Sequence, residues 1–145
     1  MAKEIENAVI DYLKSHDHCA LATVRENSTP QISGMSYVND GLTVYFTTDP
    51  FGQKAKNMEH CPDVALAISE QYSNWDEVKG VQLAGKAEWV TDKAESDRAA
   101  RLYTEKFPFI QKYLAPFNVT ISEVPFCKVT PKIINFLDYS KEFTH

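Results

Sequence analysis

Long apolar runs are missing from this sequence. No window approaches the roughly 18 consecutive apolar residues that a membrane-spanning helix needs. The first residues, Met-Ala-Lys-Glu-Ile-Glu-Asn, also lack the apolar core of a signal peptide. We therefore expect a cytoplasmic protein with no membrane partner.

A surplus of positive charge is missing as well. The chain has 15 Lys and Arg residues against 20 Asp and Glu residues, which gives a formal net charge of −5. Binding to a nucleic-acid backbone requires clustered Lys and Arg, and no run of like charges is present. We therefore expect neither nucleic acid nor an anionic membrane surface among the partners.

Cysteines are few and widely spaced. Cys19, Cys61 and Cys127 form no Cys-x-x-Cys pair, so we interpret them as buried free thiols in a reducing compartment. His16 and His18 lie just before Cys19, but this spacing matches no standard metal site. We interpret the two histidines as the polar end of a helix, and no metal site is predicted.

The chain does contain enough apolar material for one domain, because 43% of its 145 residues are hydrophobic. Mostly antiparallel strands with few helices predict a mainly β (α+β) domain over residues 1–145. This domain is a roughly six- to eight-stranded closed or split β-barrel with peripheral helices. Gly85 in mid-strand predicts a bulge or the close approach of another group. The predicted helices cover 3–15, 50–60, 92–106 and 109–114, and the predicted strands cover 19–25, 30–38, 42–47, 64–69, 80–90, 125–129 and 133–137.

One stretch, residues 43–57, joins a strand to a short helix. Asp49 is placed to cap the helix, and Pro50 suits its first position. Lys54 then falls within the first turns, where free N–H groups and the helix dipole favour an anion. The stretch therefore predicts a phosphate site. The alternative is an ordinary strand-to-helix turn with a solvated lysine.

Several short motifs, in consistent order over about residues 5–140, resemble one known family. The chain is similar to the FMN-binding split-barrel family that includes the pyridoxamine 5′-phosphate oxidases. The motifs are Ala-Leu-Ala-Thr-Val at 20–24, Val-Tyr-Phe-Thr-Thr at 44–48, Gly-Gln-Lys-Ala-Lys-Asn at 52–57, Cys-Pro-Asp-Val-Ala-Leu at 61–66, Val-Gln-Leu-Ala-Gly at 81–85 and Lys-Val-Thr-Pro-Lys-Ile-Ile at 128–134.

The resemblance implies an antiparallel split barrel that forms a homodimer, with FMN in two equivalent clefts between the subunits. It also implies a set of cofactor-binding residues. Backbone groups of the second strand would lie along the flavin ring. Residues at the end of the third strand and at the start of the following helix would hold the phosphate. A glutamine would approach the flavin from the partner subunit. These residues are Ser33, Gly34, Met35 and Ser36 for the ring, Thr47, Thr48, Gln53 and Lys54 for the phosphate, and Gln82 from the partner.

The chain also departs from the oxidases that it resembles. Neutral residues, Gln31, Ser36 and Gln53, occupy positions where those enzymes carry more cations, so Lys54 is the one cation carried over. An amide does not replace the bidentate grip of an arginine on phosphate. The C-terminal arginine and histidine segment of those enzymes has no counterpart either. We therefore expect a relative of these enzymes and not an authentic pyridoxamine phosphate oxidase.

The leading functional hypothesis is an FMN-dependent oxidoreductase that passes electrons from a reduced nicotinamide donor, NADH or NADPH, to a small acceptor. Flavin performs such chemistry itself, so no catalytic acid or base is named. Ser33, Ser36 and Tyr37 are candidates to donate hydrogen bonds near the ring. The alternatives are a non-catalytic module that binds, stores or senses flavin, and a split barrel that binds deazaflavin or haem instead.

Overall fold

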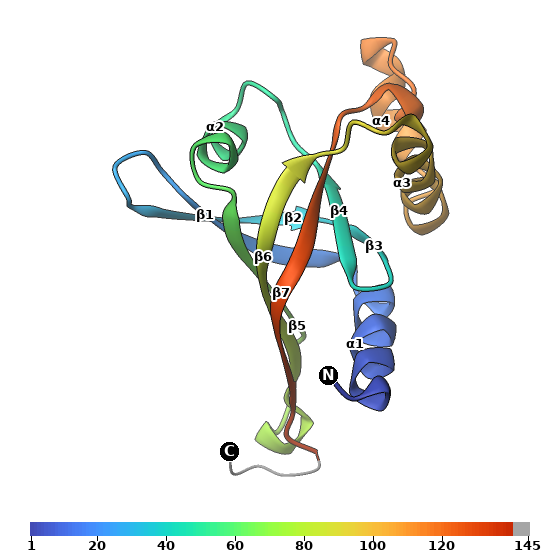
Figure 1. The fold of residues 1–145 in the computed structure, drawn as a ribbon. Coiled ribbons are helices and arrows are strands. Elements are labelled where there is room, and N and C mark those ends of the chain that lie inside the picture. Colours follow the sequence, from blue (N-terminus) through green and yellow to red (C-terminus); the bar gives the residue numbers. More distant parts are fainter. Residues whose placement is uncertain (141–145) are drawn as a thin grey trace.

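A computed structural model describes residues 1–140 as one curled antiparallel sheet with helices packed around it (Figure 1). The predicted split barrel is therefore confirmed. The elements, in chain order, are α1 (Lys3–Ser15), β1 (His18–Val24), β2 (Pro30–Ser36), β3 (Val38–Asp40), β4 (Thr43–Thr47), α2 (Gln53–His60), β5 (Asp63–Ser69), β6 (Lys79–Trp89), α3 (Lys93–Lys106), α4 (Ile110–Leu114) and β7 (Phe126–Asp138), with three short 3-10 turns.

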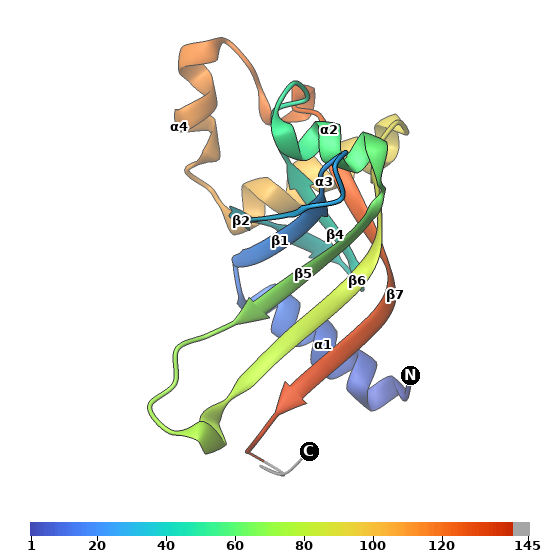
Figure 2. The same ribbon diagram turned by 90° about the vertical axis from the view of Figure 1, so that its left-hand side faces the viewer.

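The seven strands pair in the order β2-β1-β5-β6-β7-β4-β3. Strands β5, β6 and β7 are long and run side by side down the molecule, with α2 at one end of the barrel and α1 behind the strands (Figure 2). Strands β2 and β3 are the two edges of the sheet within residues 1–140. No helix in this part of the chain is both long and apolar enough to cross a membrane.

Gly85 allows β6 and β7 to approach each other more closely than any other residue would. A Cβ at this position would lie 2.1 Å from the carbonyl oxygen of Thr130. The pairing register shifts between Ala84 and Gly85, which is the predicted bulge. The expectation of two separate final strands is wrong, because this bulge lets β7 continue through Pro131 as one strand.

Two hydrophobic cores stabilise the fold. The larger lies inside the barrel, where α1 packs on the large apolar side chains that alternate along the strands. The smaller lies between α3 and the strands β3, β4 and β7. The carbonyl oxygen of Leu13, at the end of α1, accepts hydrogen bonds from the Tyr37 hydroxyl at 2.6 Å and the Lys106 ammonium at 3.3 Å.

A half-buried ionic cluster fastens α3 to the sheet. The Tyr45 hydroxyl donates to Glu95 Oε2 at 2.6 Å, and Lys128 Nζ lies 3.0 Å from Glu95 Oε1. Hydrogen bonding from Tyr45, together with the neighbouring Lys128 charge, lowers the pKa of Glu95. The carboxylate is therefore held in its ionised form where strands and helix meet.

Helix α2 begins later than predicted. Asp49 does not cap it: its carboxylate accepts the N–H of Phe51 at 2.9 Å, and its carbonyl accepts the N–H of Gly52 at 3.0 Å. This local turn uses the groups that would otherwise start a helix. The helix therefore starts at Gln53 instead of Pro50.

A buried asparagine joins α2 to the sheet. Asn57 is 1% exposed, and its Nδ2 donates to Thr23 Oγ1 at 3.0 Å and to Gln31 Oε1 at 2.9 Å. Its Oδ1 accepts a hydrogen bond from Gln53 Nε2 at 2.7 Å. The network fixes the first turn of α2 over β1 and β2.

Replacing Asn57 with leucine removes this network while keeping a side chain with the same branching and the same number of heavy atoms. We expect Asn57→Leu to lower the free energy of unfolding by about 2–3 kcal/mol, because buried acceptors on Thr23 and Gln31 lose their donor. Urea unfolding measures the change. Asn7→Leu, the same exchange at an exposed position of α1, is the control. Equal stability of the two variants would contradict a structural role for the network.

Replacing Glu95 with glutamine should give a pH-dependent loss. The folded pKa is lowered, so the stabilisation is present above the unfolded value of about 4.3 and disappears as pH falls through the folded value. Glu95→Gln should cost about 1–2 kcal/mol at pH 7 and little below about pH 3. Urea unfolding at both pH values tests this, with Glu105→Gln, at an exposed position of the same helix, as the control. An undiminished difference at the lower pH would exclude the carboxylate as its source.

Candidate functional site

The structure divides the predicted site residues between two faces of the sheet. Most of them lie where the end of β4, the start of α2 and the edge strand β2 lie near one another. Gln82 on β6 and Gly34 on β2 lie instead on the outer face of the sheet. The first set consists of Ser33, Met35 and Ser36 on β2, Thr47 at the end of β4, Thr48 just after it, and Gln53 and Lys54 at the start of α2.

Strand β2 offers alternate side chains to its two faces. Ser33 and Met35 are half-buried on the inner face, whereas Ile32 and Gly34 are exposed on the outer face. The Ser33 hydroxyl is buried but has no hydrogen-bond partner among residues 1–140. A buried hydroxyl without a partner is uncommon in folded proteins, so Ser33 stands out as the unsatisfied polar side chain of β2.

Tyr103 of α3 holds the ends of β2 and β4 together. Its hydroxyl donates to the Ser36 carbonyl oxygen at 3.3 Å. Burial raises the pKa of Tyr103, while hydrogen bonding with Ser36 and with the Thr47 backbone acts in the opposite direction. The Thr47 hydroxyl in turn donates to the Pro125 carbonyl at 2.8 Å. Ser36 and Thr47, far apart in sequence, are therefore brought to one place.

The two lysines of α2 differ in burial. Lys54, the second residue of the helix, is half-buried, whereas Lys56 is exposed. Lys56 lines a hollow with Gln53, Glu26 and Glu59. Gln53 therefore lies beside acidic side chains, and Lys54 is the cation of α2 that is partly buried.

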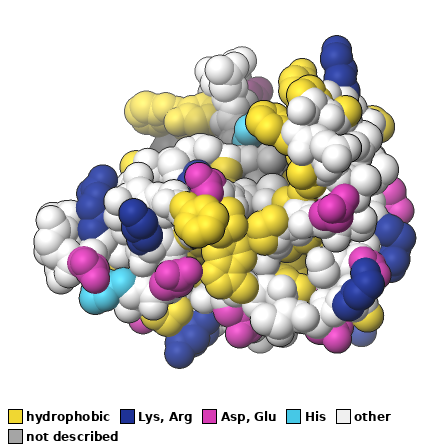
Figure 3. All heavy atoms as spheres, turned by 90° about the horizontal axis from the view of Figure 1, so that it is seen from above, with side chains coloured by type: hydrophobic (Ala, Val, Ile, Leu, Met, Phe, Trp, Pro, Cys, Tyr) yellow, Lys and Arg dark blue, Asp and Glu magenta, His cyan; other side chains and the backbone are white. Residues whose placement is uncertain are grey.

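Seen from above, this end of the molecule has hydrophobic side chains gathered beside a hollow, with charged side chains mainly around them (Figure 3). Phe51, in the turn before α2, is 85% exposed. An exposed aromatic side chain three residues before Lys54 suits a ligand that has both an anionic group and a planar apolar body.

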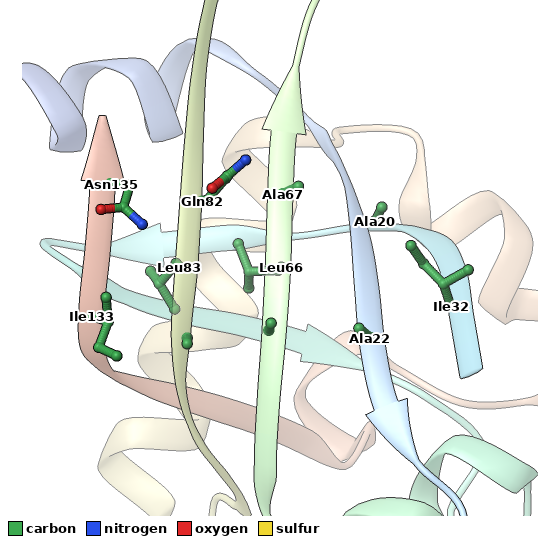
Figure 4. Close-up of a pocket in the computed structure, with 11 residues that line it drawn as sticks. Ala20, Ala22, Ile32, Leu66, Ala67, Gln82, Leu83, Ile133 and Asn135 are labelled. Atoms are coloured by element: carbon green, nitrogen blue, oxygen red, sulfur yellow. The ribbon is translucent and has the colours of Figure 1, made fainter. Parts of the chain in front are cut away.

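The outer face of the sheet carries a shallow uncharged groove of about 300 Å³ (Figure 4). Strand register places one row of residues straight across five strands of this face. Two predicted site residues, Gly34 and Gln82, belong to this row, three strands apart. The row consists of Gly34, Ala20, Ala67, Gln82 and Asn135, on β2, β1, β5, β6 and β7 in turn.

A second row lies beside the first on the same face. Its alanines form the floor, and the isoleucines at its two ends are 72% and 61% exposed. An exposed apolar surface with a smooth floor is typical of an interaction site. This row consists of Ile32, Ala22, Ala65, Ala84 and Ile133.

Three features of the site were not predicted from the sequence. The alternate alanines of β1 and β5, as in Ala65 and Ala67, were a visible signal, because they oppose large residues on the buried face. Asn57 and Tyr103 gave no such signal, since their partners lie far away in sequence. Tyr37 was interpreted as a donor near the flavin ring, but it is fully buried and its hydroxyl is engaged by Leu13.

No metal site is apparent: within residues 1–140, no group of three or more His, Cys, Asp or Glu side chains could hold an ion. His16 binds Glu70 at 2.9 Å, and His18 binds Asp17 at 2.7 Å. Both histidines therefore already bind carboxylates.

Comparison with known proteins agrees with this architecture. A family model described as pyridoxamine 5′-phosphate oxidase matches residues 5–132. General stress protein 26 of Bacillus subtilis (strain 168) is 31% identical over 93 residues, which is 64% of this chain and 64% of that protein. The match thus spans slightly less than two thirds of this curated relative.

Solved structures show the same fold at lower identity. A conserved hypothetical protein from Mycobacterium tuberculosis superposes with a TM-score of 0.78 at 21% identity, over 97% of this chain and 87% of that chain. HutZ, the haem storage protein of Vibrio cholerae, gives a TM-score of 0.69 at 17% identity, over 95% of each chain.

The family model extends over most of the chain, from α1 into the middle of β7, and includes both faces of the sheet. This chain therefore belongs to the pyridoxamine 5′-phosphate oxidase family.

Proposed function

We propose that this protein binds FMN between two copies of the chain and transfers electrons from a reduced nicotinamide donor to a small acceptor. The position of Lys54 carries this proposal. Lys54 is half-buried at the positive end of α2, beside the N–H groups of its first turn. A phosphate at this position would meet both the helix dipole and a point charge.

Several other groups fit the rest of a flavin. Thr47 and Thr48 lie at the end of β4, ahead of α2. The Ser33 hydroxyl lacks a protein partner, but it lies on the inner face of β2, opposite to Gly34, so it would not contact a ring on the outer face. A Cβ at Gly34 would meet no atom within 4 Å, so a flat ring has room beside the backbone.

The groove on the outer face supplies a place for the second copy. Nine of its eleven lining residues are alanine, leucine or isoleucine, so the groove would otherwise leave a largely apolar surface in water, and none of the lining residues is charged. A two-fold axis parallel to the strands would lay the row from Gly34 to Asn135 over the partner's row in reverse. The Gly34 end of one copy, where the ring would lie, then meets the Gln82 end of the other.

The protein's own residues would have binding and orienting roles. Lys54 and the start of α2 would hold the phosphate, and β2 would fix the ring. Tyr103 would keep Ser36 and Thr47 at a constant separation. FMN, when bound, supplies the hydride and electron transfer chemistry. No side-chain acid or base is required for hydride transfer to the ring.

Two alternatives remain distinct from this proposal. A non-catalytic flavin module would use the same residues without a nicotinamide donor. Haem is suggested by the description of HutZ as a haem storage protein, and deazaflavin would share the planar shape. Haem requires an axial ligand; His16 and His18 are already bound to carboxylates, whereas His60, exposed at the end of α2, is the histidine to test for that role.

Absorbance of the purified protein tests the proposal. We expect the bands of oxidised flavin at one FMN per chain, a molecular mass of two chains in solution, and bleaching by NADH or NADPH within a turnover time. Stable flavin bands that no nicotinamide bleaches would favour the non-catalytic module. A Soret band would favour haem, and a colourless protein that takes up no added FMN would refute the flavin proposal.

Replacing Lys54 with alanine should weaken FMN binding by about 1.5–3 kcal/mol, the range for loss of a charged hydrogen-bond partner. Fluorescence titration with FMN measures the change. Lys56→Ala on the same helix is the matched control, because Lys56 is exposed, and we expect it to change the affinity little. Equal affinities of the two variants would show that Lys54 is an ordinary surface lysine and does not hold the phosphate.

A further inference from the structure

The groove on the outer face ends in two side-by-side amides. Gln82 on β6 and Asn135 on β7 are direct cross-strand partners in the antiparallel ladder (Figure 4). Side chains paired in this way stand roughly one strand spacing apart, about 4.8 Å. Gln82 was expected from the family resemblance, but Asn135 had no predicted role.

Both amides are free to bind something outside the chain. The hydrogen bonds among residues 1–140 give neither side-chain amide a protein partner. Both residues are exposed, although the surface around them is built of alanine, leucine and isoleucine. Two polar groups in an otherwise apolar groove are typical of groups that orient a ligand.

The chemistry of the pair restricts what it can recognise. Each primary amide offers N–H donors and a carbonyl acceptor. Two of them together can donate to two carbonyl oxygens and accept one N–H between them. An imide edge, C=O, N–H, C=O, presents this pattern. The groove lining contains no Lys or Arg, so a phosphate or carboxylate would find no counter-charge there.

We propose that Asn135 and Gln82 of one copy together read the imide edge of a flavin-class ring bound by the other copy. This inference rests on the proposed function, because the row of residues brings the amide pair to the ring only when two copies pair face to face. It makes Asn135 a specificity-determining residue that favours flavin or deazaflavin over haem, since haem has no imide.

The pair also accounts for the asymmetry of the row. Its Gly34 end has no side chain, and Ala20 and Ala67 keep the middle flat. All hydrogen-bonding capacity of its side chains is concentrated at the Gln82 and Asn135 end. A row needed only for packing between two copies would not require two amides at one end.

The test compares FMN with N3-methyl-FMN, which keeps the ring and phosphate but lacks the imide N–H. We expect the wild-type protein to bind FMN about tenfold more tightly than the methylated form, as one lost hydrogen bond and a crowded edge would give. Asn135→Leu should weaken FMN about three- to tenfold and reduce the preference to about threefold or less. Asn7→Leu, at an exposed position on α1, should leave both affinities unchanged.

Asn135→Asp provides a second variant of nearly the same size. It keeps an acceptor for the imide N–H and replaces the N–H donor with a charge that repels the ring carbonyl. We therefore expect it to weaken both ligands and to keep more of the preference for FMN than Asn135→Leu does. If Asn135→Leu weakened both ligands equally, so that the preference was undiminished, the residue would have a packing role and the inference would be overturned. If that result is obtained while the wild type binds FMN, only this inference fails. If the wild type binds no FMN, the proposed function fails first.

Discussion

The close contact between β6 and β7 at Gly85 is the constraint on which the rest of the fold depends. With any side chain there, the Thr130 carbonyl would have to move, and the bulge that bends the sheet would be lost. The same β7 that passes this point pairs with β4 through Phe126 and Thr47. The curl of the sheet therefore decides where β4 ends and where α2 can begin.

Large and small residues alternate along the strands, so the two faces of the sheet differ. Leu21, Leu66 and Leu83 fill the barrel, while the small residues between them leave the outer face flat. Stability thus comes from the inner face, and the outer face is left available for another molecule. Lys54 and Gln82 lie on different faces, so one copy of the chain presents only parts of the proposed site.

Much of this arrangement follows from local sequence. The alternation of apolar and polar residues predicted the strands, and Gly85 predicted the bulge, because both signals lie within a few residues. The start of α2 was misplaced because Asp49 satisfies a turn instead of a helix. The continuity of β7 through Pro131 and the Asn57 network depend on strands far away in the chain, which no local pattern encodes. The role of Tyr103 was hidden for the same reason.

Tyr103 belongs to the smaller core while bonding to the site, and this has a dynamic consequence. Proteins open in cooperative units, and a helix on a separate small core can detach at lower cost than the main core unfolds. Detachment of α3 would break the bond between Tyr103 and Ser36 while the barrel stayed folded and Thr47 stayed paired with β7. Amide exchange along α3 would then report on ligand occupancy from outside the binding surface.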